Sequence, residues 1–236
     1  MAKEKVAVIT GASHGIGASL ASAFSAAGYN VVANSRFIGA STNPGVVNIG
    51  GDIGEPDTAD RIMNEGVGRF GRLDTLVNNA GIFISKPFTE YTQADYDAML
   101  STNVAGFFHL TQRAVRLMER QGWGHIVNVT TTEAEQPING RPALLASLTK
   151  GGLNAAIKAL AVELGPRGIR ANAVSLGIIK TQNPDSYAGL ESLDLDPLRR
   201  LGKVDDVVSA VMYLERAEFV TGEISHVDGG QSAGHW

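Results

Sequence analysis

The sequence contains no cysteine, which excludes a disulfide framework, thiolate metal sites and a cysteine nucleophile. Long apolar runs are also missing. No stretch approaches the roughly 20 residues that a membrane-spanning helix needs, and residues 1–5 (MAKEK) do not read as a signal peptide. We therefore expect a cytoplasmic protein in a reducing compartment, with no membrane partner.

Positive charge is not in excess. The formal net charge is −4 at pH 7, which argues against nucleic acid or an anionic membrane surface as a partner, because neither would be attracted. The histidines, at positions 14, 109, 125, 226 and 235, show no metal-ligand spacing with a carboxylate. We expect no metal site.

Hydrophobic residues make up 44% of the 236 positions and charged residues 19%, so the chain can form one large core. Strand-like segments alternate with helix-like ones and no linker interrupts them, which predicts a single α/β domain over residues 1–236. The predicted strands are residues 6–9, 31–33, 46–49, 73–77, 125–129, 170–174 and 223–227. This pattern predicts a doubly wound, parallel, seven-stranded sheet with helices on both faces.

The predicted helices differ in how they expose apolar residues. Residues 16–27 and 104–118 have helical periodicity. In the second, Val104, Phe107, Phe108, Thr111 and Met118 belong to one stripe, and Leu110 lies on another side. Residues 144–164 are apolar or small nearly all round, which predicts burial on two sides and hence a homo-oligomer, most simply a tetramer.

Two irregular segments are expected to be loops. About a dozen residues rich in Gly, Ser, Asn and Pro separate the second and third strands, so the usual crossover helix is predicted to be reduced to a loop. Residues 181–201 contain prolines and polar groups without a clean period, and they follow a strand. We expect a substrate lid there.

The first strand runs into residues 10–17 (TGASHGIG) and then into a helix. Glycines let the backbone turn sharply and approach a pyrophosphate, and the N-terminus of the helix offers unpaired N–H groups to the anion. The position of this loop in the first strand–helix unit predicts a dinucleotide site.

Further motifs follow in order: Asp52 and Ile53 after the third strand, residues 78–81 (NNAG) after the fourth, Asn103 opening its helix, Lys150, and residues 219–222 (FVTG) before 227–230 (VDGG). From about residue 5 to 230 the chain resembles the short-chain dehydrogenases/reductases. The resemblance implies a Rossmann fold in which Asp52 meets the adenine edge, Asn79 supports the cofactor loop and Lys150 binds the nicotinamide ribose. The other cofactor-binding residues that it implies are Gly11, Ser13, His14, Gly15, Ile16, Gly17, Ile53, Ala80, Gly81, Gly177, Ile179 and Thr181.

The second strand indicates which nicotinamide cofactor binds. An NAD enzyme places an acid at the end of this strand, and that acid would repel a 2′-phosphate. Here the strand ends Asn34-Ser35-Arg36 with no carboxylate nearby. Arg36 can fork onto a phosphate, and Ser35, Asn34 or His14 can donate to it. We therefore expect NADP(H).

The family's chemistry uses a tyrosine as general acid four residues before the lysine, and a serine after the fifth strand. Ala146 stands at the tyrosine position, and Leu176 precedes Gly177 where the family has proline. Thr131 most nearly matches the serine, with Thr130 and Thr132 as alternatives. Glu133, Glu135, Ser147 and Tyr187 are the candidates to replace the missing acid.

Asn103, Thr131 and Lys150 remain as catalytic candidates. We expect an NADP(H)-dependent oxidoreductase that reduces a small carbonyl, or a polarised C=N or C=C bond. Thr131 would orient the acceptor, and Lys150 with Asn103 would supply the proton through water. The alternative is a catalytically weakened NADP(H)-binding sensor or partner subunit, because loss of a positioned acid typically costs 10²–10⁴-fold in rate.

Overall fold

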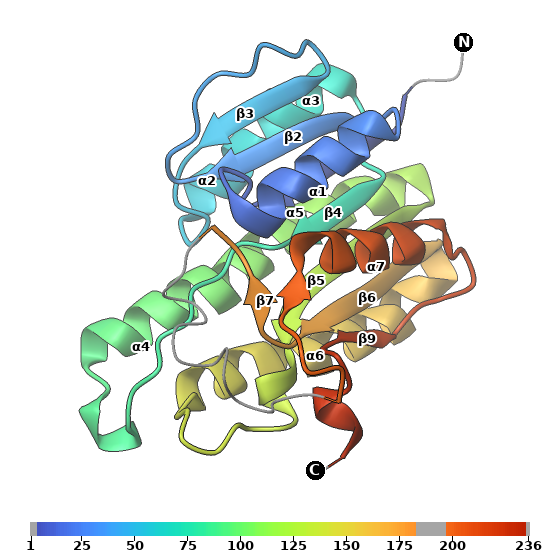
Figure 1. Ribbon diagram of the computed structural model, residues 1–236. Helices are drawn as coiled ribbons and strands as arrows, with labels where there is room; N and C mark the ends of the chain where they lie inside the picture. Colours follow the sequence, from blue (N-terminus) through green and yellow to red (C-terminus); the bar gives the residue numbers. More distant parts are fainter. Residues whose placement is uncertain (1–3, 183–196, 235–236) are drawn as a thin grey trace.

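The computed structural model describes residues 4–182 and 197–234 (Figure 1). Seven parallel strands form one sheet in the order β3-β2-β1-β4-β5-β6-β9, which confirms the predicted doubly wound α/β architecture. The strands are β1 (Val6–Thr10), β2 (Asn30–Ser35), β3 (Val46–Gly50), β4 (Thr75–Asn78), β5 (Gly124–Thr131), β6 (Ile169–Leu176) and β9 (Ile224–Val227). The chain winds outward from β1 to β3 and then returns beside β1 with β4, so a crevice opens between the carboxyl ends of β1 and β4.

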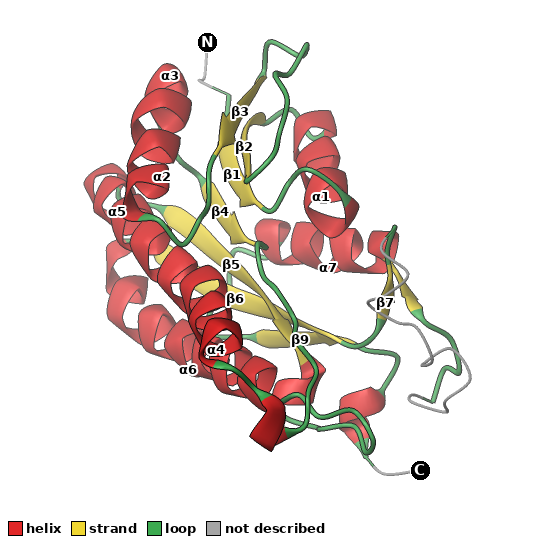
Figure 2. Ribbon diagram, turned by 90° about the vertical axis from the view of Figure 1, so that its left-hand side faces the viewer, coloured by secondary structure: helices red, strands yellow, loops and turns green. Residues whose placement is uncertain are grey.

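Helices cover both faces of the sheet (Figure 2). On one face lie α1 (Gly15–Ala26) and α7 (Val204–Arg216). On the other lie α2 (Pro56–Arg61), α3 (Gly68–Phe70), α4 (Gln93–Met99), α5 (Gly106–Gln121) and α6 (Leu144–Leu164). A π-helical segment, η1 (Ile62–Val67), joins α2 to α3. The bounds of α6 agree with the prediction, and residues 36–45 form the predicted loop between β2 and β3.

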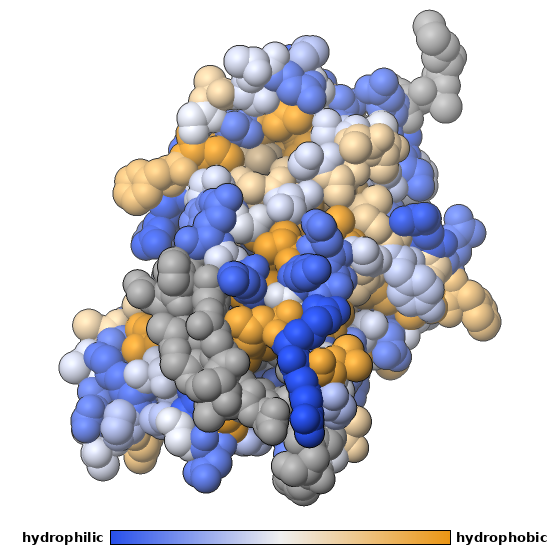
Figure 3. All heavy atoms as spheres, in the orientation of Figure 1, coloured by the Kyte–Doolittle hydropathy of each residue, from blue (hydrophilic) through white to orange (hydrophobic). Residues whose placement is uncertain are grey.

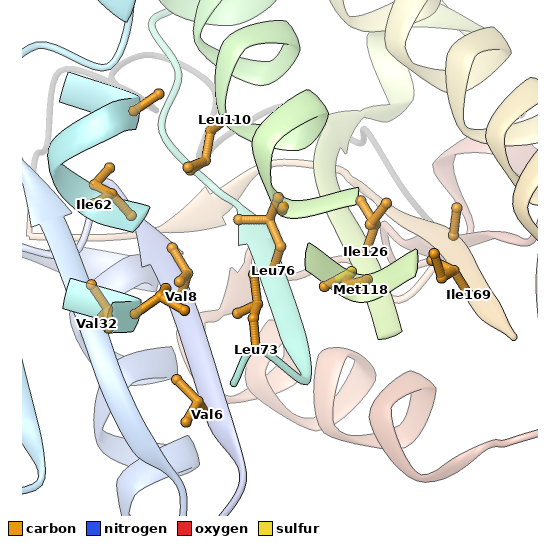
Figure 4. Close-up of a cluster of buried hydrophobic side chains, with 14 of the residues drawn as sticks. Val6, Val8, Val32, Ile62, Leu73, Leu76, Leu110, Met118, Ile126 and Ile169 are labelled. Carbon is orange, nitrogen blue, oxygen red and sulfur yellow. The ribbon is translucent and has the colours of Figure 1, made fainter. Parts of the chain in front are cut away.

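The two faces of the sheet have separate cores because alternate residues of a strand point to opposite sides. In β1, Val6 and Val8 belong to the core under α5 and α6, whereas Ala7 and Ile9 belong to the core under α1 and α7. Figure 4 shows the first of these cores, where side chains from β1, β2, β4, β5 and β6 lie in one cluster with Leu110 and Met118 of α5 and with Ile62. Burial of every residue of β1 explains why the sequence shows a continuous apolar run there.

The helix that contains Asn103 differs from the prediction. Thr92 caps its N-terminus with a capping box that includes Asp95, so helix begins at α4, about ten residues before the predicted start. A π-helical segment, η3 (Leu100–Ala105), joins α4 to α5. Asn103 therefore lies within this long helix and does not open it.

The predicted apolar stripe on α5 is also partly wrong. Phe108 is 54% exposed, whereas Leu110 is fully buried. The buried residues of α5 are Gly106, Leu110, Thr111, Ala114 and Met118, so the buried stripe is centred closer to Leu110 than predicted. The fourth strand, β4, begins two residues later than predicted because Leu73 and Asp74 lead into it.

A short parallel pair, β7 (Ile179–Lys180) and β8 (Gly202–Lys203), was not predicted. The pair brings together the two ends of the predicted lid, which spans residues 181–201. Residues 183–196 of that lid, including Tyr187, lie outside the described residues.

Candidate active site

A cavity of about 940 Å³ occupies the carboxyl edge of the sheet. Loops after β1, β2, β3, β4, β5 and β6 form its wall, so it includes the crevice between β1 and β4. In the view of Figure 3, hydrophobic atoms reach the surface in the middle of the molecule beside polar ones. Both apolar and polar residues line the cavity, and polar groups that converge on a cavity at this edge of a parallel sheet are typical of a small-molecule site.

The loop after β1 is shaped to approach a ligand closely. Gly11 has φ +67°, and a Cβ added there would lie 2.9 Å from the Ala80 Cα, so only glycine fits. Gly15 has φ +56°, and its added Cβ would meet only Thr181 within 4 Å among the described residues, so a side chain there would enter the cavity space. His14 is the N-cap of α1 and makes no side-chain cap bond, which leaves N–H groups of the first turn available to an anion.

Asn79 ties the loops after β1 and β4 together. Its Nδ2 donates to the carbonyl of Thr10 at 2.9 Å, and the Thr10 hydroxyl accepts from the backbone N–H groups of Asn79 and Ala80 at 3.1 and 3.0 Å. These bonds fix the two walls of the crevice relative to each other. The conformation of the glycine loop is therefore set before any ligand arrives.

Polar side chains gather at the end of β2. The Ser13 hydroxyl lies 2.9 Å from the Ser35 hydroxyl and 2.9 Å from the His14 Nδ1. Arg36 is exposed and lines the cavity with Ser35. Asn34, suggested above as a further donor, instead holds its own chain, because its Nδ2 donates to the carbonyls of Ile49 and Gly51.

Asp52 lines the cavity after β3, where its Oδ1 accepts from the backbone N–H of Gly54 at 2.9 Å. This bond holds the Asp52–Ile53 turn against the wall. The cluster at Ser13, Ser35 and Arg36 thus offers hydroxyl and guanidinium donors, while Asp52 supplies a carboxylate on the loop that follows the next strand.

Lys150 and Asn103 lie behind the cavity wall. A Cβ added at Gly81 would be 2.9 Å from the Lys150 Nζ and 3.2 Å from the Asn103 Oδ1, so both polar ends meet beneath this glycine. Asn103 accepts from the backbone N–H of Ile82 and donates to its carbonyl. The Lys150 Nζ donates to the Val129 carbonyl at 2.8 Å, and desolvation lowers the pKa of Lys150 to about 8.

The three threonines after β5 separate in the structure. Thr130 and Thr131 line the cavity, and their hydroxyls donate to the carbonyls of Val174 and Leu176 at 3.4 and 3.3 Å. The Thr132 hydroxyl donates to Asp228 at 3.4 Å and is buried. Thr131 also accepts from the backbone N–H of Glu133. Thr130 and Thr131 therefore remain candidates to hold a substrate oxygen.

Ala146, which the sequence predicts at the position of the family's tyrosine, is 1% exposed. It belongs to a small apolar cluster with Met99, Ala143 and Leu145, against which Ile82, Ile84 and Tyr91 pack. The Tyr91 hydroxyl donates to the Ile84 carbonyl at 2.8 Å. Ala146 therefore contributes to apolar packing.

The sequence predicted only one member of the ion pair between Glu133 and Arg141 on the cavity wall. Glu133 was a candidate, but Arg141, which lies 3.0 Å from it, carries no sequence signal because the intervening loop has no period. Phe83 is likewise on the wall, with the Arg141 guanidinium 4.5 Å above its ring. Only the fold brings these three residues together.

Most of the predicted site residues share the cavity. Those that line it are Gly11, His14, Gly15, Ile16, Gly17, Ser35, Arg36, Asp52, Ile53, Asn79, Ala80, Gly81, Thr131, Gly177, Ile179 and Thr181. Ser13 lines an adjoining cavity with His14 and Thr181, and Asn103 and Lys150 line a much smaller space beneath Gly81.

Within residues 4–182 and 197–234, no group of three or more His, Asp or Glu side chains is arranged to hold a metal ion. Within the same residues, no helix has the length and apolar character that crossing a membrane requires.

The family model described as enoyl-(acyl carrier protein) reductase matches residues 11–232. The match spans the glycine loop, both walls of the crevice and Lys150. The chain belongs to this family of short-chain dehydrogenases/reductases, as the sequence motifs indicated.

Individual relatives are similar over almost the whole chain. Ketoacyl reductase 2 of the granaticin polyketide synthase from Streptomyces violaceoruber is 36% identical, with 95% of each chain covered. Among solved structures, the 3-ketoacyl-(acyl-carrier-protein) reductase from Brucella melitensis, in complex with NADH, is 30% identical with a TM-score of 0.90, covering 97% of this chain and 98% of that one. ElxO with NADP bound is 30% identical with a TM-score of 0.88, covering 98% of this chain and all of that one.

Proposed function

We propose that the chain is an NADP(H)-dependent oxidoreductase that reduces a small carbonyl compound, or a C=N or C=C bond polarised in the same way. The observation that carries the proposal is the cavity at the β1–β4 crevice, where the glycine loop, the N-terminus of α1 and Thr131 share one wall. The relatives include ketoacyl reductases and proteins solved with NADH or NADP, which supports a nicotinamide cofactor.

The preference for NADP(H) rests on the donors at the end of β2. One relative holds NADH and another NADP, so the comparisons alone do not choose. A 2′-phosphate needs hydrogen-bond donors and positive charge, and Ser13, Ser35 and Arg36 offer both. A carboxylate, the group that selects the 2′-hydroxyl of NAD, is missing from this strand end.

The chain's residues divide the remaining tasks. When bound, the cofactor supplies the hydride. Thr131 orients the acceptor oxygen from the cavity wall, and Lys150 with Asn103 supports the proton supply through water from beneath Gly81. A lysine pKa of about 8 suits this task, because proton exchange is most effective when the pKa lies near the working pH.

The proposal is tested by following NADPH oxidation against a panel of aldehydes, ketones and imines, with cofactor binding measured in parallel. Gly11→Ala should weaken NADPH binding at least about 10-fold and turnover with it, because its Cβ would meet the backbone of Ala80. Gly39→Ala is the matched control, since an added Cβ meets nothing within 4 Å there. Binding without turnover across the panel would favour the alternative, a catalytically weakened sensor or partner subunit, which the loss of tyrosine at Ala146 also suggests. Absence of NADPH binding would contradict both.

A further inference from the structure

The side chain of Glu133 is a buried carboxyl group that faces the cavity, and the proposed function gives it no role. Glu133 lies on the 3₁₀ turn Thr132–Ala134 directly after β5 and is 3% exposed. Its Oε1 lies 3.0 Å from the Arg141 Nη1. Its Oε2 is buried and has no hydrogen-bond partner among residues 4–182 and 197–234. Because buried polar atoms almost always have a partner, an oxygen left open on a cavity wall indicates a group that serves a ligand.

The fold holds this carboxyl group beside the threonine that would orient the acceptor. The backbone N–H of Glu133 donates to the Thr131 hydroxyl at 3.3 Å. On its other side, the Ser147 hydroxyl donates to the Glu133 carbonyl at 3.0 Å, which ties the turn to α6 one residue after Ala146. Glu133 therefore lies on the same wall as Thr131, next to the helix from which the family's tyrosine would project.

Arg141 gives the carboxyl group both a fixed place and a charge partner. The guanidinium lies over the Phe83 ring and is itself mostly buried, with 13% of its side chain exposed. Burial raises the pKa of Glu133, and the nearby Arg141 charge opposes that rise only in part. The carboxyl group thus holds its proton at higher pH than an ordinary glutamate, while the carboxylate left after its loss has a cation beside it.

We propose that Glu133 donates to the substrate the proton that the family's tyrosine would supply, and that Arg141 is the positioning residue that stabilises the carboxylate which results. The inference rests on the proposed function, whose reduced nicotinamide is the hydride donor. The O–H bond of the Glu133 carboxyl breaks and an O–H bond forms at the carbonyl oxygen. The hydride forms the new C–H bond as the C=O π bond breaks. The water route proposed above for Lys150 and Asn103 then returns a proton to Glu133.

The other candidates for this task are used elsewhere in the fold. Glu135 is half-exposed and pairs with His226 at 3.1 Å and with Asn154 at 3.0 Å. The Ser147 hydroxyl already donates its proton to the Glu133 carbonyl. Lys150 lies behind Gly81, whereas Glu133 lies on the cavity wall itself. Tyr187 lies outside the described residues.

The first test is kinetic. Glu133→Gln keeps the size of the side chain and removes its transferable proton. We expect kcat to fall about 10²- to 10⁴-fold, as for loss of a general acid, with the Kd of NADPH changed less than about 2-fold. Glu133→Asp should recover part of the loss. Glu135→Gln is the matched control two residues away, and it should leave kcat unchanged. Wild-type turnover that survives Glu133→Gln overturns the inference and leaves the proposed function intact.

The second test reads the proton directly and needs no substrate. Infrared difference spectra of wild-type protein minus Glu133→Gln, from about pH 5 to about pH 8, should show a protonated carboxyl band that disappears with a midpoint above the ordinary glutamate pKa. Arg141→Met should move that midpoint upward, because the opposing charge is gone. A carboxyl group that is ionised throughout this range overturns the inference whatever the turnover. A wild-type protein that binds no NADPH overturns the proposed function instead.

Discussion

Among single residues, Ala146 bears most on the chemistry proposed for the site, because the sequence predicts it at the position of the family's tyrosine. It is 1% exposed and belongs to an apolar cluster with Met99, against which Ile82, Ile84 and Tyr91 pack. Nearby, a buried glutamate and an arginine come onto the cavity wall. The residue at position 146 therefore serves the packing of α6. We expect the proton donor to be Glu133, on the turn after β5.

This packing leads to the first prediction. Ala146→Tyr should destabilise the protein by about 1–3 kcal/mol, because the ring must displace buried apolar side chains. Urea denaturation measures the loss. Ala26→Tyr, an exposed position at the end of α1, is the matched control and should change stability far less. If the two variants were equally stable, the structure would hold an unseen space for the phenol beside Lys150.

How much of the site the sequence could predict differs from residue to residue. Gly11, Asn79 and Arg36 follow strands directly, so strand order alone brings them to one edge. The place of Asn103 in mid-helix was missed because the Thr92 cap lies outside the apolar stripe. Arg141 was missed because its approach to Glu133 depends on how a loop folds back, which no local pattern records.

At the scale of elements, a buried polar network fastens α7 to the sheet. Glu215 of α7 meets the His125 Nδ1 of β5 at 2.7 Å and accepts from the hydroxyls of Tyr29 and Thr75 at 2.7 and 2.8 Å. On the far side of the imidazole ring, His125 Nε2 lies 3.1 Å from Asn172 and 3.4 Å from Arg170 of β6. The network joins three strands to the helix through one carboxylate.

This network should make stability depend on pH. Burial lowers the pKa of His125 below its ordinary 6.5, and the Arg170 charge adds to the effect. Burial tends to raise the pKa of Glu215, but hydrogen bonds from His125, Tyr29 and Thr75 lower it overall. Both groups bind protons more weakly in the folded state. The stabilisation linked to the lowered pKa of His125 is therefore lost as the pH falls below about 6.5, and that linked to the lowered pKa of Glu215 as the pH falls below about 4.5.

The corresponding measurement is the free energy of unfolding in urea from about pH 7.5 down to about pH 5. We expect a steady loss below about pH 6.5 in the wild type and a flatter curve in His125→Asn. His109→Gln is the control, because His109 lies on α5 against Phe108 and away from this network. An unchanged slope in His125→Asn would show that the histidine is not the group responsible.

The elements themselves were the most predictable part of the structure. Parallel strands that are buried on both faces give unbroken apolar runs in the sequence. The bounds of α6 agree with the prediction because apolar or small residues occur along its whole length. The pair β7–β8 was missed because two residues per strand carry no periodicity. The stripe on α5 was placed partly wrongly because apolar residues occur on more than one side of that helix, and periodicity alone does not say which side meets the sheet.

At the scale of the whole molecule, apolar side chains remain exposed on the outer layer of helices. Phe108 of α5 is 54% exposed, and Leu148 and Val162 of α6 are 58% and 81% exposed. If another copy of the chain packed against the outer sides of α5 and α6, these apolar side chains would be covered in the interface. We therefore retain the prediction of a homotetramer.

Light scattering at micromolar concentration should return about four times the 24.8 kDa of one chain. Phe108→Arg should shift the mass toward smaller species, because a charge buried in an apolar interface is costly. Tyr29→Phe, which changes a side chain tied to Glu215 inside the fold, should leave the mass unchanged. A wild-type mass of a single chain would contradict the prediction.

For the whole molecule, we predict that NADP(H) occupies the β1–β4 crevice with its 2′-phosphate at Ser35 and Arg36. Calorimetric titration of the protein with NADPH and with NADH tests this most directly. We predict that NADPH binds about 10- to 100-fold more tightly, and that Arg36→Ala removes most of that difference while Arg69→Ala, an exposed arginine on α3, does not. Equal affinities for the two cofactors, or an Arg36→Ala variant that keeps the full preference for NADPH, would contradict the account.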